Sequence, residues 1–487
     1  MKTEERPESK MQMSAEDKER LRRRRARLAR KKRRERIRRI KIFAVMLLCA
    51  AAVLFASLKT VSSVIKKRDL KMRQEEERIL QQKEANQKAA DILKQAKVLA
   101  QQYDYEGAIA LLSSQSVSSS NEEIQSAING YKKEMESLTE VNLDEVTHIF
   151  YHSLVVDPKR GFSGTQGGQF NMWMTTVSEF NRINQSLYEK GYVLIRLRDM
   201  VKETRDKDGN VTFEKAKIML PAGKKPLILS LDDLSYYHGY DGYGMASKLV
   251  LDKDGNPTCE YVDENGKTLT GSYDCVPLLD DFVEEHPDFS YKGAKGVIAL
   301  TGYNGILGYR TDQSYQDRPD DLDYDKVAWL DKHPDFNLEQ ERESAKKVAD
   351  AMKEKGWEFA SHTWGHQYIA EISMDKLKAD TEKWMANVAP LVGGTDTIIF
   401  AHGQDIVQGG EYPADNEKYQ YLKQQGFNYF CSVDGSKYTT QITENYVRQG
   451  RRNLDGYRMY HNPEMLSDLF DAKEVFDKER PTPVPAV

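Results

Sequence analysis

The chain after Val141 predicts an α/β fold built on a parallel sheet, which is either open or closed into a barrel. Short apolar runs alternate there with amphipathic helical segments, an alternation typical of parallel strands joined by helices. Several of the runs end in Asp or His side chains. Because the carboxyl ends of parallel strands share one edge or rim, we expect these polar residues to gather there.

The N-terminal part predicts a membrane anchor. Residues 1–41 hold 19 Lys and Arg against 7 Asp and Glu, whereas the whole chain of 487 residues has a formal net charge of −4. The segment from Ile42 to Leu58 then lacks any charge and approaches the length needed to cross a bilayer. Dense positive charge before a span favours a cytoplasmic N-terminus, so we expect 1–41 to be a basic cytoplasmic segment and 42–65 a single transmembrane anchor. A cleaved signal peptide is the competing interpretation, and a nucleic-acid-binding arm is not favoured.

Residues 66–140 predict a helical stalk, either coiled-coil or of the tetratricopeptide type. The segment is charged, poor in Gly and Pro, and has sparse apolar positions. One stretch, "AKVLAQQYDYEGAIALL", resembles a single helical hairpin of a tetratricopeptide repeat, and one copy cannot bury its own face. The α/β domain then occupies 141–487.

Within that domain the expected elements follow one another in order. β-Branched and aromatic runs predict strands, and charged segments with apolar residues at helical spacing predict helices. The expected strands are 145–156, 192–197, 225–231, 296–302, 357–362, 397–403 and 427–435, and the expected helices are 174–191, 341–356, 374–392 and 416–426. Residues 253–274 predict a polar hairpin, with turn signals at "DG" and "NG".

Four cysteines do not make a disulfide framework. Cys49 lies in the predicted span, and no CxxC pattern marks a zinc site. Cys259 and Cys275 flank a turn-rich segment and could pair, an alternative left open, whereas Cys431 has no evident partner.

Two motifs carry chemistry. In "PLILSLDDLSYYH" a buried strand ends in Asp232 and Asp233, a costly pair unless a cation compensates it. In "SHTWGH" another strand ends in two histidines four residues apart, His362 and His366, a spacing that lets both imidazoles reach one metal ion. Two His and one Asp leave positions open for water and substrate, as in a catalytic metal site.

An Asp-Asp pair after one strand, followed by HTxxH after a later one, resembles the NodB-type polysaccharide deacetylases of the carbohydrate esterase 4 class. The resemblance extends from about Val146 to Asp434 and implies a distorted (β/α)7 barrel. It implies that Asp232 is the general base and that Asp233, His362 and His366 bind a divalent ion, most often Zn²⁺, with Co²⁺ or Ni²⁺ as alternatives.

The general acid is where the chain departs from the family pattern, because no final strand with an L-x-H motif is evident. "FYH" resembles the corresponding strand of a circularly permuted subgroup that acts on poly-N-acetylglucosamine, which implies His152 as the acid. His461 in "YRMYHNPEM" is the alternative. By the same resemblance, Asp434 in "CSVDG" is the carboxylate that orients the histidine, although a simple turn Asp before Gly435 fits the sequence as well.

A second departure lies in "FAHGQD", where the family usually has an Arg that orients the base. Ala401 takes that position, and His402 or Arg310 are the candidate substitutes. Among the nearby aromatic and polar residues, we expect Tyr236, Trp364 and His402 to line the substrate site.

Together these features predict a single-pass membrane protein whose extracellular domain is a metal-dependent hydrolase of amide bonds. The expected substrate is an N-acetylated polysaccharide that contains N-acetylglucosamine, either peptidoglycan or poly-N-acetylglucosamine. A catalytically weak or inactive glycan-binding pseudoenzyme, and an envelope scaffold acting through the helical stalk, are the alternatives. Protein partners cannot be read from the sequence.

Overall fold

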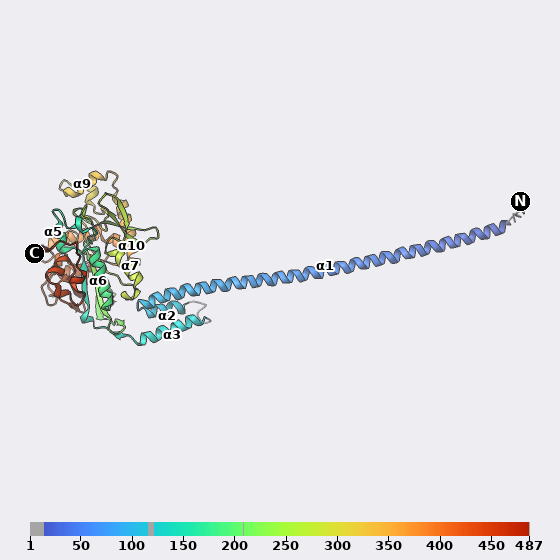
Figure 1. Ribbon diagram of the computed structural model, residues 1–487, viewed down its shortest axis with the longest axis horizontal. Coiled ribbons are helices and arrows are strands. Elements are labelled where there is room, and N and C mark those ends of the chain that lie inside the picture. Colours follow the sequence, from blue (N-terminus) through green and yellow to red (C-terminus); the bar gives the residue numbers. More distant parts are fainter. Residues whose placement is uncertain (1–13, 115–120, 208, 487) are drawn as a thin grey trace, which may run out of the picture. The chain divides into compact units, whose positions relative to one another are not determined.

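Seven parallel strands pair edge to edge in a closed ring, which makes the fold a barrel (Figure 1). The computed structural model describes residues 14–114, 121–207 and 209–486. In order round the ring the strands are β2 (Thr147–Tyr151), β7 (Lys225–Asp232), β11 (Val297–Leu300), β12 (Glu358–Ser361), β13 (Thr397–Ile399), β14 (Tyr429–Val433) and β16 (Val447–Asn453). Every pairing is parallel, and β16 closes the ring on β2. The predicted α/β class and the seven-stranded barrel are confirmed.

The ring is distorted at β7, which has different neighbours along its length. Its first residues pair with β3 (Tyr192–Leu194), and its last three pair with β11, in register from Val297↔Ser230 to Ala299↔Asp232. β3 therefore lies beside the ring and is not one of its seven strands, although residues 192–197 were expected to form an ordinary strand of the sheet. Apart from Lys225 the residues of β7 are buried, as expected for a strand with both faces covered.

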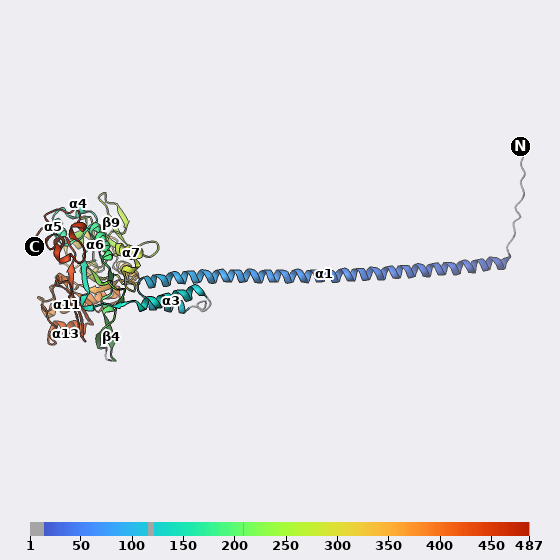
Figure 2. The same cartoon turned by 60° about the horizontal axis from the view of Figure 1, so that its bottom comes forward.

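Helices join successive strands and cover the outside of the barrel. The predicted helix at 174–191 is α6, where Thr176 and Glu179 form a reciprocal capping box that fixes its start. The main helices of the barrel unit are α5 (Gly167–Trp173), α6 (Val177–Glu189), α7 (Cys275–Glu285), α9 (Tyr324–Lys332), α10 (Leu338–Glu354), α11 (Met374–Asn387), α13 (Glu417–Gln424) and α14 (Gly456–His461). In Figure 2, α11 and α13 are neighbours, in agreement with their contacts.

Shorter elements decorate the barrel. The expected hairpin is part of a three-stranded antiparallel sheet of β8 (Ala246–Leu251), β9 (Pro257–Val262) and β10 (Thr268–Gly271). Short pairs form between β1 (Thr139–Glu140) and β6 (Met219–Leu220), and between β4 (Val201–Arg205) and β5 (Val211–Lys215). β15 (Thr440–Ile442) pairs antiparallel with β16 outside the ring. The remaining helices are α4 (Pro158–Gly161), α8 (Ser314–Asp317), α12 (Ala389–Val392) and α15 (Ala472–Val475).

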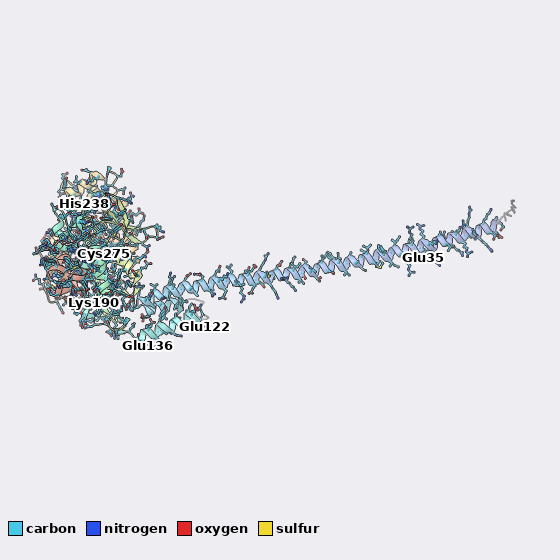
Figure 3. All side chains as sticks on the ribbon, in the orientation of Figure 1. Glu35, Glu122, Glu136, Lys190, His238 and Cys275 are labelled. Atoms are coloured by element: carbon cyan, nitrogen blue, oxygen red, sulfur yellow. The ribbon has the colours of Figure 1, made fainter. Side chains whose placement is uncertain are left out.

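The N-terminal part of the chain forms one long helix, α1 (Ala15–Gln101). The part of this helix up to Ala89 belongs to a structural unit separate from the barrel. Among the described residues this helix alone is long and apolar enough to cross a membrane, with a mean hydropathy of 2.4 over its most apolar window. The side chains of that window are exposed. Figure 3 labels Glu35, which lies in the basic part of α1 before the window. The first 13 residues of the expected basic segment lie outside the described part of the chain.

From Ala90 onward the helical residues belong to the barrel unit. α2 (Tyr105–Ser113) packs against α3, which runs between the two residues labelled Glu122 and Glu136 in Figure 3. The Tyr103 hydroxyl donates to the Asp288 carbonyl oxygen at 2.8 Å, and the Lys292 amide N–H donates to the Gln102 carbonyl oxygen at 2.8 Å. The end of the predicted stalk is thus attached to the barrel by specific hydrogen bonds.

The cysteines of the barrel unit, Cys259, Cys275 and Cys431, are free thiols buried in the core. The pairing of Cys259 with Cys275 that the sequence left open is not made.

Candidate active site

The two adjacent aspartates lie where β7 ends, at the carboxyl rim of the barrel. Asp232 is 4% exposed and Asp233 is 7% exposed. Asp233 has a φ of 60°, in the left-handed region that residues other than Gly adopt at a cost, and its N–H donates to the Ala299 carbonyl oxygen at 3.1 Å. The residues Tyr236, Thr363, His366 and His402 also have positive φ. Such conformations cluster at functional sites, where the surrounding structure enforces them.

The Asp232 carboxylate is held by Arg451, a fully buried residue of β16. Arg451 Nη1 lies 2.7 Å from Asp232 Oδ1, and Nη2 lies 3.0 Å from Oδ2, so the pair is bidentate. Burial alone would raise the pKa of Asp232, but the charges of Arg451 and His362 bring it to about 2. Asp232 is therefore an ionised carboxylate in a fixed orientation.

Arg451 thus contributes the guanidinium that was missing at Ala401, and neither of the expected substitutes does so. Arg310 donates instead to backbone oxygens of the loop after the Asp pair, with Nη2 2.9 Å from the Tyr236 carbonyl oxygen. His402 Nε2 lies 3.1 Å from the His366 carbonyl oxygen. The Arg comes from β16, a strand that the sequence did not predict.

The two histidines of the HTWGH segment lie next to the Asp pair. His362 Nδ1 lies 2.7 Å from the Ile399 carbonyl oxygen, which makes Nδ1 the protonated nitrogen and leaves Nε2 free as a ligand. His362 Nε2 lies 4.0 Å from Asp232 Oδ2, and His366 Nε2 lies 3.5 Å from Asp233 Oδ2. Burial lowers the pKa of His366 despite the charge of Asp233, which favours the neutral imidazole that binds metal.

The turn that carries both histidines is fixed by the Asp380 carboxylate of α11. It accepts the Trp364 N–H at 2.7 Å and the Gly365 N–H at 2.8 Å, while the Thr363 hydroxyl accepts the Gln367 N–H at 2.8 Å. The two imidazoles are therefore positioned by hydrogen bonds to the backbone between them.

The donor atoms of Asp233, His362 and His366 fit a single divalent ion, because they lie within 4.8 Å of one another. The Tyr237 hydroxyl donates to Asp233 Oδ1 at 2.5 Å and is 2.6 Å from Thr301 Oγ1. Although burial opposes ionisation, His366 and His362 hold the pKa of Asp233 below its usual value. One carboxylate and two imidazoles with an oriented outer partner form a set suited to Zn²⁺ and to similar ions.

His152 follows β2 and lies in the electrostatic field of the site. Its charge lowers the pKa of both Asp232 and Asp233, behind the larger effects of burial and of their nearer partners. The alternative acid, His461, has its Nε2 3.0 Å from the Val484 carbonyl oxygen, among residues of the C-terminal segment. The structure thus brings His152, and not His461, to the Asp pair.

Asp434 is placed in a turn. Its carboxylate accepts the Ser436 N–H at 2.7 Å and the Thr439 hydroxyl at 2.6 Å, and its side chain is exposed. Besides the Asp pair, Asp455 is a carboxylate whose charge interacts with that of His152; it is 2% exposed and caps α14 by accepting the Arg458 N–H at 2.7 Å. Asp455 lies two residues after the end of β16, and it was not identified as a candidate from the sequence.

The three expected lining residues differ in position. Tyr236 is buried in the core, where its hydroxyl donates to Asp274 Oδ2 at 2.8 Å. Trp364 is half-buried, and its Nε1–H donates to Asp312 Oδ2 at 3.0 Å. His402 is exposed, with its ring centroid 4.2 Å from that of the His366 imidazole. Only His402 combines exposure with direct contact to a metal-ligand candidate.

Residues 333–404, which include both histidines, match the family model for polysaccharide deacetylase. Two solved structures are also similar: the Streptococcus pyogenes deacetylase PplD in complex with acetate (13% identity, 68% of this chain and 99% of that chain, TM-score 0.35) and a Bacillus cereus polysaccharide deacetylase (12% identity, 68% of this chain and 69% of that chain, TM-score 0.33). No curated protein is significantly similar to this sequence.

The family match confirms the resemblance to NodB-type polysaccharide deacetylases that the two motifs predict. Residues 333–404 carry this match to the polysaccharide deacetylase family, which supports a hydrolase activity on amide bonds. The circular permutation stays a prediction.

Proposed function

We propose that this protein removes N-acetyl groups from an envelope polysaccharide that contains N-acetylglucosamine, in a reaction that depends on a divalent metal ion. The observation that carries the proposal is the cluster of donor atoms from Asp233, His362 and His366 beside the Arg451-bound Asp232. Peptidoglycan and poly-N-acetylglucosamine are the two candidate substrates.

Each residue has a defined task in this reaction. A divalent ion bound by Asp233, His362 and His366 would supply Lewis acidity toward the acetamide carbonyl and toward water. Asp232 accepts the proton of the attacking water, whose oxygen forms the new bond to the carbonyl carbon. The carbon–nitrogen bond then breaks, and His152 donates a proton to the leaving amine. The products are acetate and a free amino sugar.

Asp455 supports the role of His152 in this proposal. Burial raises the pKa of Asp455, and hydrogen bonds from Arg458 and Asn453, followed by the charge of His152, oppose that rise. Asp455 replaces Asp434 as the proposed partner.

The missing Arg at Ala401 was the reason to consider an inactive pseudoenzyme. The bidentate Arg451–Asp232 pair removes that reason.

The proposed location is the cell membrane, with α1 as a single span, the N-terminus in the cytoplasm and the barrel outside. Fusing reporter enzymes to either end tests this orientation.

Acetate release from acetylated glycans with added Zn²⁺ or Co²⁺ tests the function. We expect the wild-type protein to release acetate and Asp232→Asn to release at least a thousandfold less per unit time, as for loss of an essential base acting at a metal site. Equal, background release by both proteins would contradict the proposal.

A further inference from the structure

Beside the metal-ligand cluster, an exposed aromatic ring is held in a fixed position. The Tyr368 phenol ring stacks on the His402 imidazole with 3.6 Å between ring centroids and 1° between planes. Tyr368 is nevertheless 47% exposed, and in the part of the chain that the structure describes it has no other aromatic neighbour. This exposed ring therefore lies beside the candidate active site, separated from His366 by the His402 imidazole.

His402 connects the stack to the backbone of His366, and the backbone of Tyr368 is held by a turn. His402 Nε2 lies 3.1 Å from the His366 carbonyl oxygen, and the ring centroids of His366 and His402 are 4.2 Å apart. The Tyr368 carbonyl oxygen accepts the Glu371 N–H at 2.9 Å and the Ile372 N–H at 3.2 Å. The Tyr368 ring therefore stands one imidazole away from a proposed metal ligand, with its stacking on His402 defining its orientation.

A cavity of about 600 Å³ begins at the residue after His402, between the loops that follow β13 and β14. Its lining combines an apolar part, including Ile406 and Val433, with hydroxyl and amide groups such as those of Thr440 and Gln441. The volume lies within the range of sites that bind small molecules, and the mixed lining suits a ligand with both CH faces and hydroxyl groups.

The charges around this cavity disfavour an anionic ligand. The Asp405 carboxylate is neutralised by Arg448, with 2.8 Å between Arg448 Nε and Asp405 Oδ2, and it also accepts the Tyr412 hydroxyl at 2.8 Å. The exposed Asp434 carboxylate belongs to the lining and would repel an anionic group.

We propose that the exposed Tyr368 ring is the stacking platform of a sugar-binding subsite, and that the adjoining cavity binds a further unit of a neutral N-acetylhexosamine chain. The apolar face of a pyranose ring stacks on the phenol, while its hydroxyl groups bind the polar groups of the lining. This inference rests on the proposed function and adds a second contact of the glycan, outside the reacting sugar.

Direct binding tests the subsite independently of catalysis. The Kd values of two pentamers of N-acetylglucosamine, one β-1,4-linked and one β-1,6-linked, are measured by calorimetry for the full chain in detergent. The variants are Tyr368→Ala, which removes the ring, and Tyr368→Phe, which retains it. Tyr324→Ala is the matched control, because Tyr324 is 82% exposed and lies on α9, away from this cavity.

We expect Tyr368→Ala to raise the Kd of at least one pentamer about tenfold, as for the loss of one stacking contact, while Tyr368→Phe and Tyr324→Ala stay within about twofold of wild type. An unchanged Kd in Tyr368→Ala overturns the inference, and so does the absence of wild-type binding to both pentamers. Acetate release by the wild-type protein is measured separately. If the wild-type protein releases acetate but Tyr368→Ala binds the pentamers with an unchanged Kd, the subsite alone is refuted. If pentamer binding depends on Tyr368 but no acetate is released, the proposed activity alone is refuted.

Discussion

The guanidinium of Arg451 on β16 and the carboxylate of Asp232 on β7 form a bidentate pair that spans the intervening strand β2, at 2.7 and 3.0 Å, with both side chains buried. Arg451 also lies over the Phe150 ring, at 4.3 Å from its centroid, so the cation is enclosed on one side by an aromatic face. The orientation of the proposed base thus depends on a residue 219 positions away in the sequence.

Replacing Arg451 by Gln is expected to reduce acetate release per folded molecule at least a hundredfold, because Asp232 loses both its orientation and its compensating charge. Arg452→Gln is the matched control: Arg452 is the next residue, is also buried, and pairs with Asp468 at 2.8 Å. Steady-state kinetics and thermal unfolding are measured for both variants. Equal activity losses in the two would show that Arg451 acts through stability alone.

The sequence predicted most of the barrel, because its strands are apolar runs followed by helices with regular periodicity. It missed β16, whose residues Val447–Asn453 read "VRQGRRN" and have the composition of a polar loop. These polar residues are buried together with partners that are distant in the sequence or follow the strand: Arg451 binds Asp232, and Arg452 binds Asp468. Such long-range pairing leaves no periodic pattern in the sequence.

The candidate site was predictable to the extent that its residues form short motifs. Asp232, Asp233, His362 and His366 belong to two motifs at strand ends, and the structure brings all four together. Asp455 and Arg451 have no such motif. One signal could have pointed to Arg451. A buried Asp pair calls for compensating positive charge, and the basic stretch "GRR", which contains Arg451, follows "CSVDG" without an assigned role.

Tyr237→Phe is expected to weaken Zn²⁺ binding about 10- to 100-fold, because the hydroxyl that donates to Asp233 Oδ1 orients this ligand. Isothermal titration of the metal-free protein measures the effect. Tyr240→Phe serves as the control, since the Tyr240 ring packs edge-on against that of Tyr237 at 5.5 Å without a hydrogen bond to the ligand. If the two variants bind Zn²⁺ alike, Tyr237 has no orienting role.

Acid is expected to destabilise the barrel through His148, a fully buried residue of β2. Burial, reinforced by the charge of Arg451, lowers the pKa of His148 well below 6.5. As the pH falls below about 6.5, the His148 imidazole takes up a proton in the unfolded chain but not in the folded protein. The stability contributed by neutral His148 is therefore complete above about pH 6.5, and it falls by about 1.4 kcal/mol per pH unit below that value.

Urea unfolding of the wild type and of His148→Gln, at pH 7.5 and pH 5.5, checks this expectation. The variant should lose less stability between the two pH values than the wild type does. His333→Gln is the control, because His333 is exposed. Identical pH dependence in wild type and His148→Gln would assign the acid sensitivity to other groups.

The buried ion pair of Glu179 and Arg480 is expected to be strongly coupled. Both side chains are fully buried, and Arg480 Nε lies 2.9 Å from Glu179 Oε1 while Nη2 lies 2.5 Å from Oε2. Arg480→Met should cost about 3–5 kcal/mol of unfolding free energy, since it leaves Glu179 charged and unpaired. Glu179→Gln combined with Arg480→Met should recover part of that loss, because the neutral amide oxygen can still accept the Thr176 N–H that caps α6, and additive losses in urea unfolding would exclude the coupling.

The closure of the ring between β16 and β2 has a consequence for how the protein matures. Arg451 belongs to the last strand of the ring, whereas Asp232 belongs to β7, so the two charges meet only when the whole barrel has assembled. A nascent or C-terminally clipped chain has every residue of the two sequence motifs and yet no oriented base. Under the proposed function, hydrolysis is thereby reserved for the fully folded domain.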